Sequence, residues 1–87
     1  MRHARSEALD ELEPTLERLR ALPGLREKSR GTFYRGSKAF LHFHEDPTGI
    51  HADVKLGGDG FTRLRVQTAA ERTALVKRVE DALSDRT

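Results

Sequence analysis

The sequence predicts an α+β protein, a two-layer sandwich in which a helix, a four-stranded antiparallel meander and a second helix follow one another along the chain. Three observations lead to this class: leucines recur at helical spacing near the amino terminus, apolar residues then alternate with polar ones, and a helix-capping pattern precedes the last apolar stripe. Two apolar helices and one half-apolar sheet bury each other only if both helices cover the same sheet face. We therefore expect the other face, called here the open face, to be free of helices.

The first helix is predicted over residues 6–22. Its apolar positions are three, four, three and three residues apart and so form one stripe: Leu9, Leu12, Leu16, Leu19 and Leu22. Ser6 is the expected N-cap, and Pro23 followed by Gly24 ends the helix. Pro14 lies inside the stripe without an amide hydrogen to donate, so we expect a kink or a restart of the helix there.

Four strands and a closing helix follow. The strands are predicted over residues 31–35, 38–45, 49–56 and 61–67, because the apolar period there is two. Turn-forming residues separate them, namely Gly36-Ser37, Asp46-Pro47-Thr48 and Gly57-Gly58-Asp59-Gly60. These short separators predict hairpins and hence a meander. The second helix is predicted over residues 69–83, since Thr68 and Glu71 have the spacing of a capping box and precede an apolar stripe.

The strand at residues 49–56 alternates most clearly and sets the expected register. Placing Glu45 opposite Ile50 turns the apolar residues of both strands toward the helices. The same register puts His44 opposite His51 and His42 opposite Asp53 on the open face. A two-residue turn at Gly36-Ser37 sets Phe33 opposite Phe40, also on the open face, and Arg65 is expected near Asp53. The predicted open face is Phe33, Arg35, Lys38, Phe40, His42, His44, His51, Asp53, Lys55, Arg63 and Arg65.

Composition limits the classes of function. The chain has 87 residues, 36% of them hydrophobic and 34% charged, which predicts one domain over residues 1–87. It has no cysteine, which excludes disulfides, thiolate nucleophiles, iron–sulfur clusters and Cys-based zinc sites. No apolar run approaches the roughly 20 residues of a membrane span, and the amino terminus is charged, so we expect a cytoplasmic protein without a membrane partner. No cofactor is expected.

Nucleic-acid binding is the first functional hypothesis. The net charge of +2 is small, but residues 23–45 hold five basic and two acidic residues, an excess of +3. Two aromatic residues of the predicted open face, Phe33 and Phe40, could stack on bases. Its cations would contact phosphates: Arg35, Lys38, Lys55, Arg63 and Arg65. The competing interpretation is an ordinary solvated, charged face.

Metal binding is the alternative hypothesis. Four residues on neighbouring strands of the predicted open face offer ligand atoms: His42, His44, His51 and Asp53. Cross-strand neighbours have Cβ atoms about 4.5 to 5.5 Å apart, within reach of a shared ion. Imidazoles are also ordinary residents of a solvated sheet face, and no His-x-x-x-His or similar motif is present.

An enzyme is not expected. No serine lies in a Gly-x-Ser-x-Gly turn, and the glycine-rich stretch at residues 57–60 lacks the Lys-Ser/Thr of a phosphate-binding loop. A His42–Asp53 pair could act as a general base, but an open sheet face offers no evident pocket to exclude water.

Four short segments resemble the MmcQ/YjbR-like family: Leu22-Pro23-Gly24-Leu25, Gly31-Thr32-Phe33-Tyr34-Arg35, Lys38-Ala39-Phe40-Leu41 and Thr68-Ala69-Ala70-Glu71-Arg72. The similarity extends over about residues 12 to 83 and implies a fold similar to the frataxin/CyaY type. It also implies DNA binding, because the family is often described in that way on the basis of its fold. The sequence thus predicts a small non-enzymatic domain that binds nucleic acid, with a metal- or small-ligand-binding module as the alternative. Exposed sheet edges leave homodimer formation open.

Overall fold

The structure, a computed structural model, describes residues 2–57 and 60–84. It contains two helices and an antiparallel sheet, so the predicted α+β class is confirmed. The elements in chain order are β1 (Arg2–His3), α1 (Ser6–Arg20), β2 (Arg26–Ser29), β3 (Thr32–Arg35), β4 (Lys38–Asp46), β5 (Gly49–Val54), β6 (Thr62–Arg65) and α2 (Ala69–Ser84). The predicted order of elements is matched only roughly, because β1 and β2 were not expected.

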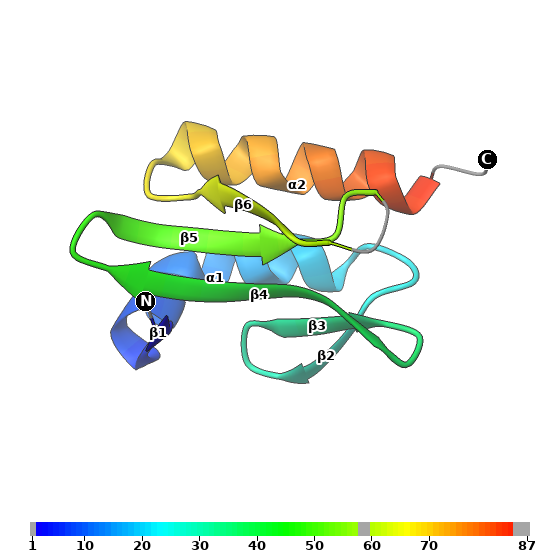
Figure 1. The fold of residues 1–87 in the computed structure, drawn as a ribbon, viewed down its shortest axis with the longest axis horizontal. Coiled ribbons are helices and arrows are strands. Elements are labelled where there is room, and N and C mark those ends of the chain that lie inside the picture. Colours follow the sequence, from blue (N-terminus) through cyan, green and yellow to red (C-terminus); the bar gives the residue numbers. More distant parts are fainter. Residues whose placement is uncertain (1, 58–59, 85–87) are drawn as a thin grey trace.

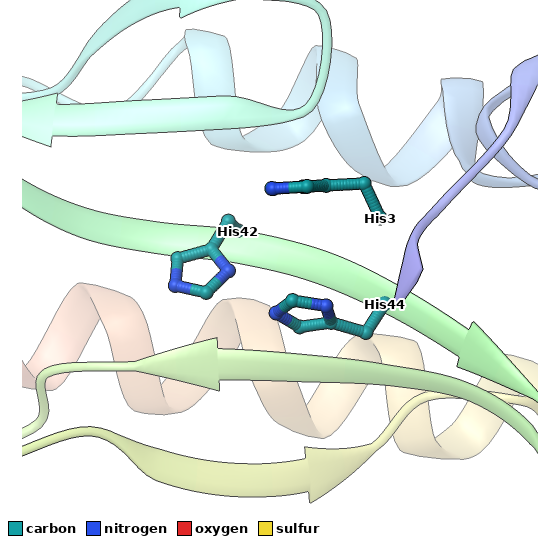
Figure 2. A group of neighbouring side chains, drawn as sticks. All are labelled: His3, His42 and His44. Carbon is teal, nitrogen blue, oxygen red and sulfur yellow. The ribbon is translucent and has the colours of Figure 1, made fainter. Parts of the chain in front are cut away.

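In Figure 1, α1 lies behind β4 and β5, and α2 runs alongside β6; in Figure 2 both helices lie behind the strands. One hydrophobic core joins α1, α2 and the strands. Its largest fully buried side chains are Phe33, Phe43, Leu12, Leu16, Leu19, Leu41, Leu75, Val54, Val66 and Val79. The open face is the side of the sheet turned away from this core.

The sheet has the strand order β2-β3-β4-β5-β6, with every neighbouring pair antiparallel. Strand β4 is the longest, with nine residues, and it also pairs with β1. Its first half pairs with β3, whereas its last residues pair with β1 through Arg2–Glu45 and His3–His44. The amino terminus is thereby brought to the middle of the sheet.

The register predicted for the hairpin of β4 and β5 is confirmed. Glu45 lies opposite Ile50, and the polar pairs are His44 with His51 and His42 with Asp53. On the helix side the same register pairs Phe43 with Ala52, and both are buried. Strict alternation over six residue pairs allows only this register, because a shift by one residue would place imidazoles in the core.

The prediction that Phe33 and Phe40 lie on the open face is wrong. Phe33 is fully buried and Phe40 is 3% exposed, and both belong to the core. The hairpin of β3 and β4 starts as expected with Tyr34 opposite Ala39, but Phe33 then lies opposite Leu41. Phe40 is the extra residue of a β-bulge, which breaks the alternation and lets Phe40 and Leu41 both be buried.

Strand β2 has no apolar alternation to reveal it, because its sequence is Arg-Glu-Lys-Ser. It pairs with β3 across a turn that contains Gly31, whose φ of +82° suits glycine. A Cβ on Gly31 would also lie 2.7 Å from Leu9 Cδ2 of α1. Glu27 supports this turn by accepting a hydrogen bond from the Gly31 amide at 2.8 Å.

The helix ends differ in how well they were predicted. Helix α1 runs past Pro14 without the expected restart. Because Pro14 is exposed, water can solvate the backbone carbonyl four residues earlier, which receives no hydrogen bond from proline. Its N-cap position is Arg5, which makes no side-chain cap, and Ser6 is the first helical residue. In α2 the predicted capping box forms, with Glu71 N donating to Thr68 Oγ1 at 3.1 Å and Thr68 N donating to Glu71 Oε1 at 2.9 Å.

Among the described residues, no helix is long and apolar enough to cross a membrane.

Candidate functional site

Three histidines gather on the open face, and we call them the histidine cluster: His3, His42 and His44. One ring nitrogen of each lies within 4.8 Å of the corresponding nitrogens of the other two. Figure 2 shows His42 and His44 side by side on β4, with His3 reaching toward them from β1. The ring centroids of His42 and His44 are 4.7 Å apart, and those of His3 and His44 are 5.2 Å apart.

Strand alternation and a short strand pairing create the cluster. His42 and His44 are two residues apart on β4, so they project from the same face. His3 reaches that face because it pairs with His44 across β1 and β4. Two further contacts hold the segment: Ala4 N donates to Phe43 O at 3.1 Å, and Arg5 N donates to Glu45 Oε2 at 2.5 Å.

The imidazoles are poorly satisfied as hydrogen-bonding groups. His42 Nδ1 and both ring nitrogens of His44 are buried without a hydrogen-bond partner among the described residues. Burial lowers the pKa of His42, and charge on His44 would lower it further, whereas Asp53 opposes this shift. The neutral form of His42 is therefore favoured, which leaves a nitrogen lone pair available for a ligand.

A carboxylate lies next to the cluster. Asp53 is 8% exposed and is held by Arg63 through two hydrogen bonds, from Nε at 2.7 Å and from Nη2 at 2.8 Å. Hydrogen bonding to Arg63 lowers the pKa of Asp53, so this carboxylate is ionised at neutral pH. Its Oδ2 is 3.2 Å from His44 Nε2, within ion-pair distance but outside hydrogen-bond alignment.

The residues predicted as metal ligands are only partly brought together. His42 and His44 belong to the histidine cluster, whereas His51 and Asp53 are not in it. His51 shares the open face, where it lies between His44 and Arg65, and Asp53 is engaged by Arg63. His3 was missed because its partner on β4 is forty-one residues away, beyond α1 and two strands, and no local pattern reports such a pairing.

The residues predicted for nucleic-acid binding are also divided. Phe33 and Phe40 are in the core and present no ring for stacking. Arg35 and Lys38 are exposed at the turn between β3 and β4, but they pair with each other on the same side as Phe33, so the prediction that they belong to the open face is wrong. On the open face, Arg63 lies opposite Asp53 and Arg65 lies opposite His51. The partner of Asp53 is therefore Arg63 and not, as expected, Arg65. Lys55 follows β5 on the same face.

Two other aromatic rings occupy the open face instead. The ammonium nitrogen of Lys28 lies 4.5 Å from the ring centroid of Tyr34, and that of Lys55 lies 5.1 Å from the ring centroid of Phe61. Phe61 also meets His42 edge-on, with ring centroids 5.0 Å apart. The second cation–aromatic pair thus adjoins the histidine cluster, whereas Lys28 and Tyr34 belong to β2 and β3 at the other side of the sheet.

Comparison of the chain with family models, with curated proteins and with solved structures gives no match. The resemblance to the MmcQ/YjbR-like family stays a prediction.

Proposed function

We propose that the protein binds a divalent transition-metal ion through His3, His42 and His44. The observation that carries the proposal is the convergence of three ring nitrogens, all within 4.8 Å of one another. Tetrahedral zinc with Zn–N bonds of about 2.0–2.1 Å places its nitrogen ligands roughly 3.4 Å apart. Modest side-chain rotations would bring the cluster to that spacing.

The chemistry of the donor set supports the same proposal. Neutral imidazoles suit zinc, copper, nickel and iron, whereas calcium and magnesium prefer oxygen ligands. Buried nitrogens without partners are costly in a folded protein, and a metal ion would satisfy them. Asp53 stands where a carboxylate could orient His44, as such groups do around metal-bound histidines.

The proposal is tested by titrating tag-free protein with Zn²⁺, Ni²⁺ and Co²⁺ in a calorimeter. We expect one ion per chain and a melting temperature that rises with metal concentration, because binding to the folded state stabilises it. Replacing any one of the three ligands, as in His3→Ala, His42→Ala or His44→Ala, should weaken binding by at least about tenfold.

The matched control is His51→Ala. His51 is an imidazole on the same sheet face and next to His44, but it lies outside the cluster. Its replacement should leave metal affinity nearly unchanged. Absence of binding to the wild type, or an equal loss in His51→Ala, contradicts the assignment. His3→Ala is the cleanest ligand variant, since His3 is exposed and its loss should leave the core intact.

A second candidate function, binding of single-stranded nucleic acid, is favoured by the charge of the open face. Of the acidic side chains on that face, Asp53 is paired with Arg63, and Asp46 lies at the end of β4 on the same side as His44. The cations on it are Arg26, Lys28, Lys55, Arg63 and Arg65. Tyr34 and Phe61 offer rings on which bases could stack.

This second candidate is tested with a fluorescent single-stranded oligonucleotide at two salt concentrations. Binding should weaken with salt, with a slope of about 0.7 per phosphate contact. Lys28→Ala should reduce the salt slope by about 0.7, because it removes one phosphate contact. Tyr34→Ala should reduce the affinity and leave the salt slope unchanged. No binding at about 50 mM salt would remove this candidate, because non-specific contacts are strong under that condition.

A further inference from the structure

Phe61, which is exposed, and Lys55, which is half-buried, form a patch beside the histidine cluster. Phe61 is 44% exposed and is the one large hydrophobic side chain that is exposed among the residues 2–57 and 60–84. Single exposed apolar residues are common on proteins and by themselves require no explanation. Here, however, the ring touches a proposed metal ligand, His42, and carries an ammonium group over its face.

The charges around the cluster favour an anion. Arg63 is engaged by Asp53, and Arg65 lies 3.2 Å from Glu71, so both guanidinium groups already have a carboxylate. Within the described part of the chain, Lys55 makes no ion pair. A metal ion held by three imidazoles keeps a coordination position for a ligand from solution. Along β4 the other two imidazoles lie on one side of His42, and Lys55, whose amide donates to Phe40 O, lies on the other, so a bound ion and the ammonium group would attract negative charge to His42 from both sides.

We propose that the metal-loaded site binds a small aromatic oxyanion, a carboxylate or a phosphate monoester. The oxyanion would complete the coordination of the metal and contact Lys55, and the aromatic group would pack on Phe61. This inference rests on the proposed function, since it requires the metal. It also explains why an exposed phenyl ring adjoins His42 and a lysine.

The other cation–aromatic pair provides a built-in control. Lys28 and Tyr34 are likewise a lysine and an aromatic residue on the open face, and their ammonium-to-ring distance is similar, at 4.5 Å against 5.1 Å. They are on β2 and β3, whereas the cluster is on β1 and the second half of β4. Substitutions of Lys55 and Phe61 should therefore change anion binding at the proposed site, whereas substitutions of Lys28 and Tyr34 should not.

The experiment uses the visible absorption of Co²⁺-loaded protein. Four anions are added in turn: acetate, benzoate, inorganic phosphate and phenyl phosphate. Each anion that enters the coordination sphere should change the cobalt spectrum, and the aromatic member of each pair should bind about three- to tenfold more tightly than the simple anion. Benzoate against phenyl phosphate then decides whether the oxyanion is a carboxylate or a phosphate.

The variants separate the two parts of the site. Phe61→Ala should abolish the preference for the aromatic anions and leave the simple anions unaffected, and Phe61→Leu should retain part of it. Lys55→Ala should weaken the binding of all four anions, whereas Lys28→Ala and Tyr34→Ala should bind them with the affinity of the wild type. A cobalt spectrum that no anion changes, or an aromatic preference that survives Phe61→Ala, overturns this inference alone. Failure of cobalt to bind overturns the proposed function together with it.

Discussion

On the helix side of β4, Leu41 and Phe43 are buried in the common core, whereas on the open side His42 and His44 are partly buried with ring nitrogens that lack hydrogen-bond partners among the described residues. The same strand therefore presents two surfaces of opposite character. The helix side lowers the free energy of the folded state by removing apolar area from water. The open side carries groups that cost stability unless a ligand satisfies them, which is why we place the function there.

The largest expected effect comes from the helix side. Phe43→Ala removes a ring that is 1% exposed, so it should lower the free energy of unfolding by about 3–5 kcal/mol through lost burial and a residual cavity. Urea unfolding measures this loss, and Phe43→Leu should recover a large part of it. A cost below about 1 kcal/mol would show that Phe43 is not packed as described.

Asp53 sharpens the comparison because it is the open-face residue on which stability should depend most. Asp53→Asn weakens its contact with Arg63 and should cost about 1–2 kcal/mol at pH 7, a range reduced because the Arg63 side chain is 52% exposed. The pKa of Asp53 is lowered in the folded state, chiefly by Arg63, so its contribution is present above the unfolded pKa of about 3.9.

That contribution is lost as the pH falls through the lower folded-state pKa. Wild type and Asp53→Asn should therefore differ in stability at pH 7 and differ less at pH 2 in urea unfolding. Asp81→Asn is a suitable control, because its contact with Lys77 is an exposed pair on α2 that contributes little. A difference between wild type and Asp53→Asn that is the same at both pH values would argue against an ionised Asp53.

A smaller effect is expected from the protonation of His42 in metal-free protein. Burial, followed by the charge of His44, lowers the pKa of His42, so the unfolded chain binds a proton more readily than the folded one. Stability is then fully present above the unfolded pKa of about 6.5 and decreases as the pH falls. With a chelator present, the melting temperature should fall from pH 7 to pH 5, and less steeply in His42→Gln. Equal slopes in the two proteins would show that His42 is not the group responsible.

The smallest effect tests the open face itself. Phe61→Ala should change the free energy of unfolding by no more than about 0.5 kcal/mol, because the ring is 44% exposed. A loss comparable to that of Phe43→Ala would mean that Phe61 is a core residue, and the contrast between the two faces would disappear. Thermal melts of the two variants under one buffer condition make the comparison.

The parts of the fold that could be predicted were those determined by local pattern. The leucine stripe of α1 and the capping box of α2 are set by residues three or four positions apart, so their helices could be recognised from the sequence. The register of β4 and β5 was accessible for a related reason. The short turn and the clean alternation leave one arrangement in which Phe43 and Ala52 are buried while His42 and Asp53 are not.

Phe40 and His3 show why other features were not predictable. Regular alternation would place Phe40 with His42 on the open face, but the gain from burying a phenyl ring favours a bulge that turns it into the core. His3 joins the cluster because two residues at the amino terminus pair with the end of β4. No pattern within residues 2–5 encodes that contact.

The sequence by itself determined the class, the two helices, the hairpin of β4 and β5 and two of the three clustered histidines, because each follows from periodicity or from a short turn. Only the tertiary structure decided that His3 completes the cluster in place of His51, that Phe61 replaces Phe33 and Phe40 as an exposed ring, and that Arg63 holds Asp53. Those outcomes depend on which strands become neighbours and on how the core fills, and both are settled by contacts between residues far apart in the chain.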